Sequence, residues 1–212
     1  MARPILKPDR KYTFSDYFDL NNLSEDVVAE LGYSLRTESR QLPQVAPDTA
    51  TVARMQREFL QTLPFIRLNS EIGKREFLIA PVLREVVIQA HPALFSDYTI
   101  EVSNQLSGSL DYLLRAARRL VVIEAKKGDL EKGFTQLAAE MIAVDQYYES
   151  DDPSAELYGA VTIGEVWRFA VLQRPNKLLL RDLNTYGVPQ DLHAVLSILL
   201  GILQPATNAT PA

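Results

Sequence analysis

The chain has 212 residues, of which 47% are hydrophobic and 23% are charged, and its formal net charge is −5. A chain of this length fits one domain with an extension and is long enough to bury a full core. It contains no cysteine, which excludes disulfides, thiolate chemistry and cysteine-type zinc sites and fits a reducing cytoplasm. The negative charge argues against nucleic-acid binding over the whole surface, but it leaves room for a locally basic cleft.

The longest apolar run, residues 194–204, has about half of the ~20 residues that a membrane-spanning helix needs. The first residues are basic but include no apolar segment of the length typical of a signal peptide. We therefore expect a cytoplasmic protein without a membrane partner.

Residues 1–67 predict an N-terminal helical extension. The stretch 13–33 suggests short helices, and residues 36–49, which include two prolines, predict a loop. Residues 50–64 predict a longer helix, because apolar residues recur at helical spacing. The residues on that face are Val52, Met55, Phe59 and Leu63.

Residues 68–204 predict a compact α/β domain that opens with a helix. Ser70 is a favourable N-cap for a helix over residues 71–90. Pro81 predicts a kink in it, because an interior proline removes a hydrogen bond and clashes with the preceding turn. Three strands are expected next, at residues 98–105, 109–116 and 119–127.

Asp129 then predicts the cap of a helix that runs to about Tyr148 and carries an apolar stripe. Further strands are expected at residues 156–163, 165–173 and 177–184, with a turn at Gly164 between the first two, and a last helix at residues 191–203. This order predicts a mixed sheet flanked by helices.

The stretch VVIEAKK, residues 121–127, places charges at the end of an apolar strand. Glu124 and Lys126 share one face there, about 6.6 Å apart by rise. A hairpin with the preceding strand would bring Asp111 alongside Glu124. Two carboxylates repel unless a divalent cation bridges them, and a nearby lysine can stabilise charge on a phosphoryl oxygen. The pattern fits Mg²⁺-assisted phosphodiester cleavage, and a surface Glu–Lys pair beside an unrelated aspartate explains it equally well.

Asp111 and the Glu124-Ala125-Lys126 triplet on consecutive strands resemble the PD-(D/E)xK phosphodiesterase superfamily, which has the restriction-endonuclease-like fold. The segments SEIGKREFLIAPVL and YGAVTIGEVWRFAVL are similar to the leading helix and a later hairpin in the nuclease domain of type I restriction motor subunits. The resemblance covers residues 68–185. The residues before it are similar to those of small uncharacterised cyanobacterial members of the superfamily.

The chain departs from this family pattern at two positions. Leu110 stands where the motif has its proline, and Glu140 stands where relatives have the tyrosine of a Gln-x-x-x-Tyr pattern. The missing proline is common in the superfamily, whereas Glu140 leaves the role of the tyrosine without a residue.

The resemblance implies a restriction-endonuclease-like core in α-β-β-β-α-β order with one nuclease site. Asp111 and Glu124 would hold Mg²⁺ or Mn²⁺, the carbonyl of Ala125 would be a third oxygen ligand, and Lys126 would be the catalytic lysine.

Two further residues are implied around that site. Gln136 would face it from the following helix, where a solvent-facing glutamine is the alternative. Glu71, ten residues before Pro81, would be an outer-sphere or metal-linked acid, and an ordinary first-turn glutamate favoured by the helix dipole is the alternative. Glu85 lies on nearly the same helix face but about 21 Å away by rise, so both cannot serve one site.

The expected function is that of a metal-dependent endonuclease or related phosphodiesterase acting on DNA. The alternative is a non-catalytic module of the same fold that binds a partner protein or nucleic acid, which the acidic charge favours. The apolar last helix predicts either burial in the monomer or a homodimer seam, and residues 205–212 predict a disordered tail.

Overall fold

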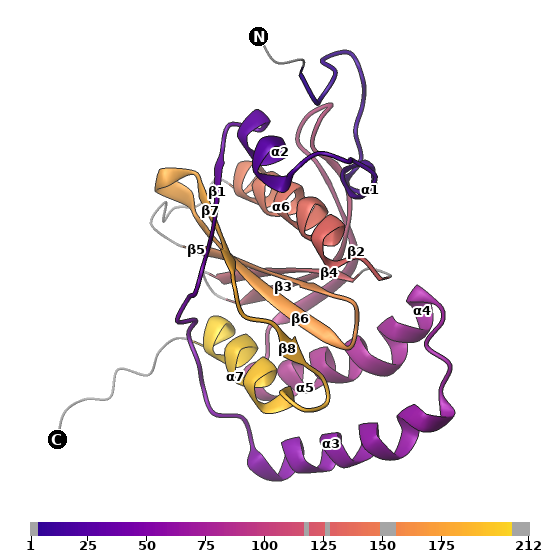
Figure 1. Ribbon diagram of the computed structural model, residues 1–212. Helices are drawn as coiled ribbons and strands as arrows, with labels where there is room; N and C mark the ends of the chain where they lie inside the picture. The colour runs from indigo at the N-terminus through magenta and orange to yellow at the C-terminus, as the bar shows by residue number, and fades with distance from the viewer. Residues whose placement is uncertain (1–3, 117–118, 126–127, 149–155, 205–212) are drawn as a thin grey trace, which may run out of the picture.

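A single mixed β-sheet runs through the molecule (Figure 1). The computed structural model describes residues 4–116, 119–125, 128–148 and 156–204, and of residues 119–125 it describes the backbone alone. The sheet order is β1-β7-β6-β5-β4-β3-β2, and β8 pairs with β6. The strands are β1 (Ser34–Glu38), β2 (Ala93–Glu101), β3 (Ser107–Ala116), β4 (Arg119–Ala125), β5 (Glu156–Thr162), β6 (Val166–Gln173), β7 (Leu178–Asp182) and β8 (Tyr186–Gly187).

Two strand pairs, β4 with β5 and β1 with β7, are parallel, and the other pairs are antiparallel. The parallel β4–β5 pair requires a crossover, and the helix α6 supplies it. The sequence prediction of an α/β protein with a mixed sheet is therefore confirmed.

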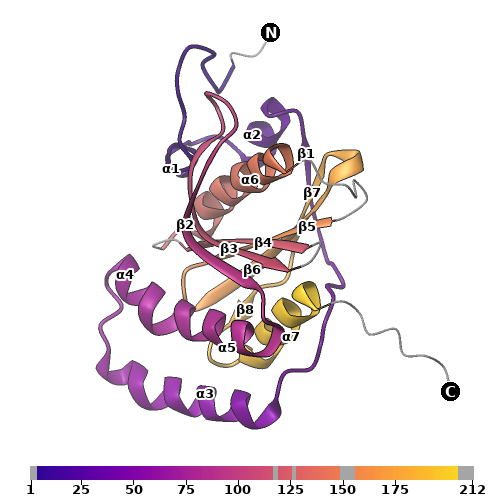
Figure 2. The ribbon, with the colours of Figure 1, turned by 180° about the vertical axis from the view of Figure 1, so that it is seen from behind.

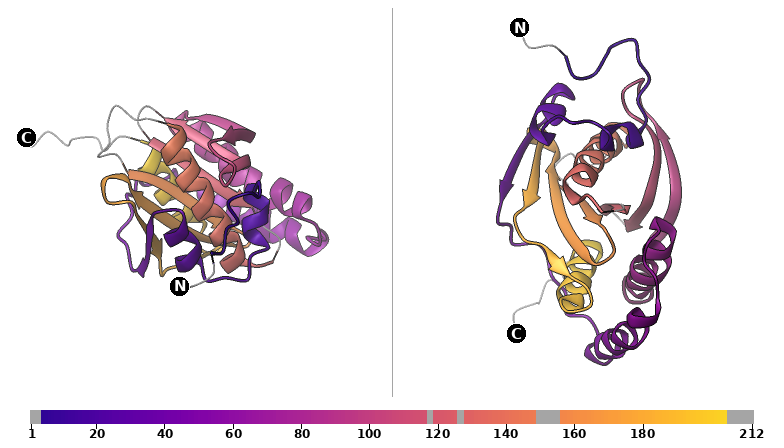
Figure 3. Two further views of the ribbon diagram at one scale, coloured as in Figure 1. Left: turned by 90° about the horizontal axis from the view of Figure 1, so that it is seen from above. Right: turned by 45° about the vertical axis from the view of Figure 1, so that its right-hand side comes forward.

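Helices cover both faces of the sheet (Figures 1 and 2). On one face lies α6 with α1 and α2 above it, and on the other lie α5, α7 and α3. Their bounds are α1 (Phe14–Phe18), α2 (Ser24–Glu30), α3 (Thr49–Thr62), α4 (Glu71–Lys74), α5 (Ala80–Ala90), α6 (Leu130–Tyr147) and α7 (Leu192–Leu203). Each face has its own apolar core, so the sheet separates two packed layers. Figure 3 shows the sheet and its helices in two further views. None of the helices in the described part of the chain is both long and apolar enough to span a bilayer.

The leading helix of the domain is interrupted just before Pro81. Ser70 caps α4 as predicted, since its Oγ accepts a hydrogen bond from the Gly73 amide at 3.0 Å. A π-helical segment, Arg75–Ile79, joins α4 to α5. Pro81 has no amide hydrogen to donate into the preceding turn, and a wider π turn accommodates this loss. A kink was predicted at Pro81; the structure has a π-helical segment before it, from Arg75 to Ile79, and Pro81 lies in the first turn of α5.

The first 67 residues are built into both layers. Residues 34–38 form the edge strand β1, which pairs in parallel with β7, although residues 36–49 were predicted to be a loop. That prediction was wrong for β1, because its pairing is with a strand far along the chain and its own residues are polar and largely exposed. The domain boundary expected near residue 67 stays a prediction.

The last helix, α7, is buried within the monomer. Its leucine, isoleucine and valine side chains are at most 3% exposed. A Cβ on Gly201 would lie 2.4 Å from the backbone at Pro43 and Gln44, so the loop before α3 covers this helix closely. Of the two alternatives for the apolar sequence of α7, the structure shows burial in the monomer. The residues predicted to form a disordered tail, 205–212, lie outside the described residues.

Candidate functional site

The strand register brings two of the predicted site residues to neighbouring positions. In the antiparallel β3–β4 pair, Tyr112 lies opposite Ile123. The pairing ends there, and β2 likewise has no pair for Asp111, so Asp111 and Glu124 each lie one residue beyond the last β3–β4 pair. The neighbouring parallel pair puts Glu124 beside Val161, which packs in the apolar core under α6. Glu124 is the second-last residue of β4 and so lies at the carboxyl end of that strand.

The helix α4 reaches the same edge of the sheet. The turn after β5 contains Gly164, whose positive φ of 89° suits glycine. A Cβ there would lie 2.9 Å from Leu78 Cδ1 and 3.4 Å from Lys74 Cβ. The turn is therefore packed against the leading helix. Because the ends of β4 and β5 lie next to each other, α4 lies close to the end of β4 as well.

Asp111 is engaged by an arginine of the π-helical segment. Arg75 Nη2 donates to Asp111 Oδ1 at 2.9 Å, and the two side chains are 22% and 17% exposed. The same guanidinium lies 3.8 Å from Asp97 of β2, and its central carbon is 5.2 Å from the ring centroid of Tyr112. Burial lowers the pKa of Arg75, but the charge of Asp111 and the contacts with Tyr112 and Asp97 raise it, and the net pKa lies above the usual value. The group is a permanent cation beside the predicted metal ligand.

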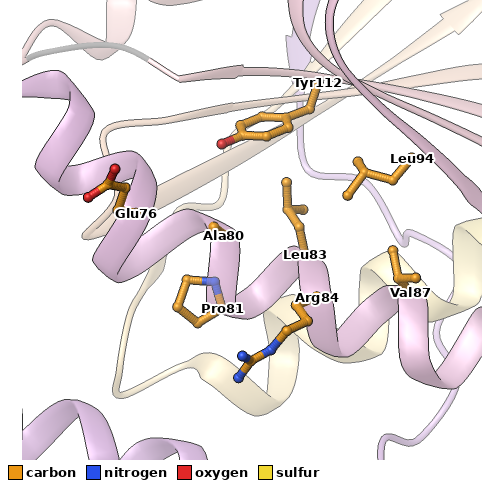
Figure 4. Close-up of a pocket in the computed structure, with 8 residues that line it drawn as sticks. All are labelled: Glu76, Ala80, Pro81, Leu83, Arg84, Val87, Leu94 and Tyr112. Carbon is orange, nitrogen blue, oxygen red and sulfur yellow. The ribbon is translucent and has the colours of Figure 1, made fainter.

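An apolar cavity adjoins this arginine–aspartate pair. It has a volume of about 380 Å³ and lies between α5 and strands β2 and β3. Figure 4 shows Tyr112 pointing from β3 toward Ala80 and Leu83 of the helix, so the tyrosine that holds Arg75 also lines the cavity. Glu76 and Arg84 stand at its rim. This cavity has no constellation of polar groups of its own that would define a reaction.

The polar residues of α6 form the next part of the site. Asp129 caps the helix as predicted, through hydrogen bonds from the amides of Glu131 and Lys132 to Oδ1. Gln136 and Glu140 are 2% and 0% exposed, and Gln136 Nε2 donates to Glu140 Oε1 at 2.9 Å. Within the described part of the chain, Gln136 Oε1 has no hydrogen-bond partner.

The direction of this pair follows from its neighbours on the helix. Leu137 and Met141 pack directly over Gly159 of β5. Glu131 contacts arginines of β6 and β7, so one edge of α6 faces those strands. Gln136 and Glu140 lie on the opposite edge by helical geometry, which faces β4 and β3. The glutamine is thus buried on the side of the predicted site and is not exposed to solvent.

The remaining predicted residues are placed in part. Ala125 is the last residue of β4, and Glu71 is the first residue of α4, one turn before Arg75. The side chain of Glu124 and the whole of Lys126 lie outside what the structure describes.

Sequence reasoning missed Arg75. A signal for it was present, because Arg75 follows Glu71 by four residues and therefore lies on the same face of the helix. The predicted metal site consisted of oxygen ligands and one lysine, and that motif does not include an arginine.

The donor set suits a hard divalent cation. Mg²⁺ and Mn²⁺ take carboxylate and carbonyl oxygens, which Asp111, Glu124 and Ala125 offer. Among the described side chains, no group of three or more His, Cys, Asp or Glu residues could hold a metal ion. The residues fit the ion in chemistry, and Arg75 competes with it for an oxygen of Asp111.

Comparisons with known proteins do not name a family. No model of a known protein family matches the chain, and no curated protein matches it. The resemblance to the PD-(D/E)xK superfamily stays a prediction that rests on the residues quoted above.

Proposed function

We propose that the protein is a metal-dependent phosphodiesterase of the PD-(D/E)xK type that acts on nucleic acid, with DNA as the expected substrate. One observation supports this proposal: Asp111 of β3 and Glu124 of β4 each lie one residue beyond the last pair of these two adjacent strands, Tyr112 and Ile123, near the end of β5 against which α4 packs. The succession of α5, β2, β3, β4, α6 and β5 is the α-β-β-β-α-β order of the restriction-endonuclease-like core, which supports the same proposal.

The roles of the residues follow from their chemistry. Asp111, Glu124 and the carbonyl of Ala125 would hold the metal. Bound there, Mg²⁺ would supply Lewis acidity toward a phosphoryl oxygen and acidify a water molecule. Lys126, by the family pattern, would offset the negative charge that develops on the phosphoryl group. Gln136 would orient a group in the site, because its buried amide donates to Glu140 at one end and its Oε1 has no hydrogen-bond partner among the described residues.

A plasmid-nicking assay with Mg²⁺ or Mn²⁺ tests the proposal. Lys126→Ala should abolish cleavage, a loss of at least about a hundredfold, because charge stabilisation in the transition state is lost. Lys11→Ala is the matched control, since Lys11 pairs with Glu101 in an exposed ion pair at 2.7 Å and should matter little. Equal cleavage by the Lys126→Ala variant and the unmodified protein, with both variants folded by circular dichroism, would contradict the proposal.

The ion pair between Arg75 and Asp111 supports a second candidate function. A protein of this fold that does not catalyse a reaction can keep its aspartate neutralised by an arginine, as Asp111 is by Arg75. In that case the chain would serve as a binding module for nucleic acid or a partner protein. Calorimetric titration with Mn²⁺ in the presence of a DNA duplex separates the two candidates. Saturable Mn²⁺ binding that Asp111→Asn removes supports the enzyme, whereas an absence of binding at millimolar Mn²⁺ supports the module.

A further inference from the structure

We propose that Arg75 makes metal binding at Asp111 depend on nucleic acid. In the free protein its guanidinium neutralises the aspartate, and a phosphate group of the bound nucleic acid then takes over the guanidinium and releases the carboxylate for the metal. This inference rests on the proposed function and adds a residue and a binding order to the same site.

The first step of the argument is the competition for one carboxylate. Arg75 Nη2 donates a charge-assisted hydrogen bond to Asp111 Oδ1 at 2.9 Å. A metal ion bound by Asp111 would compete with Arg75 for this carboxylate. A divalent cation bound to Asp111 would stand within a few ångströms of the guanidinium, and like charges at that distance repel strongly in a partly buried site. With Arg75 in this position, the free protein should bind Mn²⁺ or Mg²⁺ poorly.

The second step concerns what can replace the aspartate as the partner of Arg75. A guanidinium has five N–H donors in a plane, and the contact with Asp111 uses one of them. The side chain is 22% exposed, so an incoming group can reach it. Phosphate, like carboxylate, can accept two parallel hydrogen bonds from the planar guanidinium of arginine. The phosphodiester backbone of a nucleic acid therefore has the chemistry to draw Arg75 away from Asp111.

The third step concerns the place of the arginine in the fold. Arg75 stands at the junction between α4 and the π-helical segment, and irregular segments of this kind are frequent at functional sites. The Tyr112 ring, 5.2 Å from the guanidinium carbon, offers a surface along which the group can shift without losing its cation–π contact.

The experiment measures Mn²⁺ affinity by calorimetry, with and without a short DNA duplex, at constant ionic strength and in a Lys126→Ala background so that the duplex is not cut. In the background protein, the duplex should raise Mn²⁺ affinity at least about tenfold, and Mn²⁺ should raise duplex affinity by the same factor, because coupling is reciprocal. Adding Arg75→Gln should raise the Mn²⁺ affinity of the free protein at least about tenfold and reduce the effect of the duplex to less than about threefold.

Two further variants separate charge from packing. Arg75→Lys keeps the positive charge, so the Mn²⁺ affinity of its free protein should stay within about threefold of the background protein. Arg54→Gln removes an arginine from an ion pair with Glu58 on α3 and should change none of these values.

The inference is overturned if Arg75→Gln leaves Mn²⁺ affinity unchanged, if Arg75→Lys raises it as much as Arg75→Gln does, or if the duplex acts equally with and without Arg75. In these cases Mn²⁺ still binds and the proposed function stands. A complete lack of Mn²⁺ binding in every variant, with and without duplex, overturns the proposed function together with the inference.

Discussion

The two long buried helices on opposite faces of the sheet, α6 and α7, solve the same packing problem with different residues. In α7 the buried positions are apolar or small, apart from Ser197, whose hydroxyl donates to the carbonyl of His193 within the helix at 2.8 Å. In α6 every residue from Gly133 to Val144 is buried, and Thr135, Gln136 and Glu140 are among them.

Packing alone does not explain the buried polar residues of α6. Thr135 is accounted for by a hydrogen bond with Ser24 at 2.7 Å, which joins α6 to α2. Burying Gln136 and Glu140 carries a desolvation cost that leucine or methionine would avoid. Their position on the edge that faces β3 and β4 places that cost beside the candidate site. We interpret the sequence of α7 as the result of packing requirements alone. The buried Gln136–Glu140 pair of α6 is better explained by a role in the candidate site.

The largest expected effect is on activity and comes from making α6 resemble α7. The double variant Gln136→Leu, Glu140→Leu should lose nicking activity by at least about a hundredfold, because the oriented amide is gone. It should be more stable than Glu140→Leu alone, since the single variant leaves Gln136 Nε2 buried without its acceptor, at about 1–3 kcal/mol. Nicking and urea denaturation of the three proteins check this. Full activity in the double variant would show that the pair serves packing.

The next effect is on stability and comes from truncating α7. Leu199 is fully buried, so Leu199→Ala should lower the free energy of unfolding by about 2–5 kcal/mol through lost burial and a cavity. His193→Ala, at an exposed position of the same helix, should change it by less than about 0.5 kcal/mol. Denaturation curves give both values. A small loss at Leu199 would mean that α7 is less tightly packed than its burial indicates.

A somewhat smaller loss is expected at the point where α7 meets the loop before α3. In Gly201→Ala the new methyl group would overlap the backbone of Pro43 and Gln44, which must move, at about 1–3 kcal/mol. Gly187→Ala is the matched control, because its Cβ would meet no atom closer than 3.6 Å. Equal unfolding midpoints for the two variants would contradict the close approach.

The smallest effect concerns the carboxyl end of α6, where polar contacts are structural. Tyr33 donates to Asp145 Oδ2 at 2.7 Å, and burial together with this hydrogen bond raises the pKa of Tyr33 from 10.0 to about 12. The native state therefore holds the phenol proton more tightly than the unfolded chain, and stability should fall as the pH rises from 10 toward about 12. Tyr33→Phe should remove this part of the alkaline loss, about 1 kcal/mol or less. Urea denaturation at about pH 9 and pH 11 checks it, and an unchanged alkaline loss would contradict it.

The local elements followed from the sequence because their causes are local. Ser70 and Asp129 were expected to cap helices and do so, and the apolar face of α3 packs as its spacing predicted. The strand β1 was missed because its partner, β7, is about 140 residues away, and pairing between distant strands leaves little trace in a short polar segment.

The sequence drew attention to the two carboxylates of the candidate site but not to Arg75. Asp111 and Glu124 stood out because acids in apolar strands contradict the pattern around them. Arg75 belongs to the π-helical segment after α4, and its contact with Asp111 depends on how this part of the chain packs against the sheet, including the β5–β6 turn. The sequence did not predict the hydrogen bond between Gln136 and Glu140 either, because helical spacing allowed the glutamine to face either solvent or a cleft.

By itself, the sequence determined most of the helices and strands, the caps that start two of the helices and the acidic residues within apolar strands, because hydrophobic periodicity and capping act within a few residues. Only the tertiary structure decided that Asp111 meets Arg75, that Gln136 and Glu140 are buried toward β4, and that α7 is enclosed by its own chain. Those outcomes depend on which surfaces of distant elements fit against each other, and packing of that kind is not encoded in any one segment.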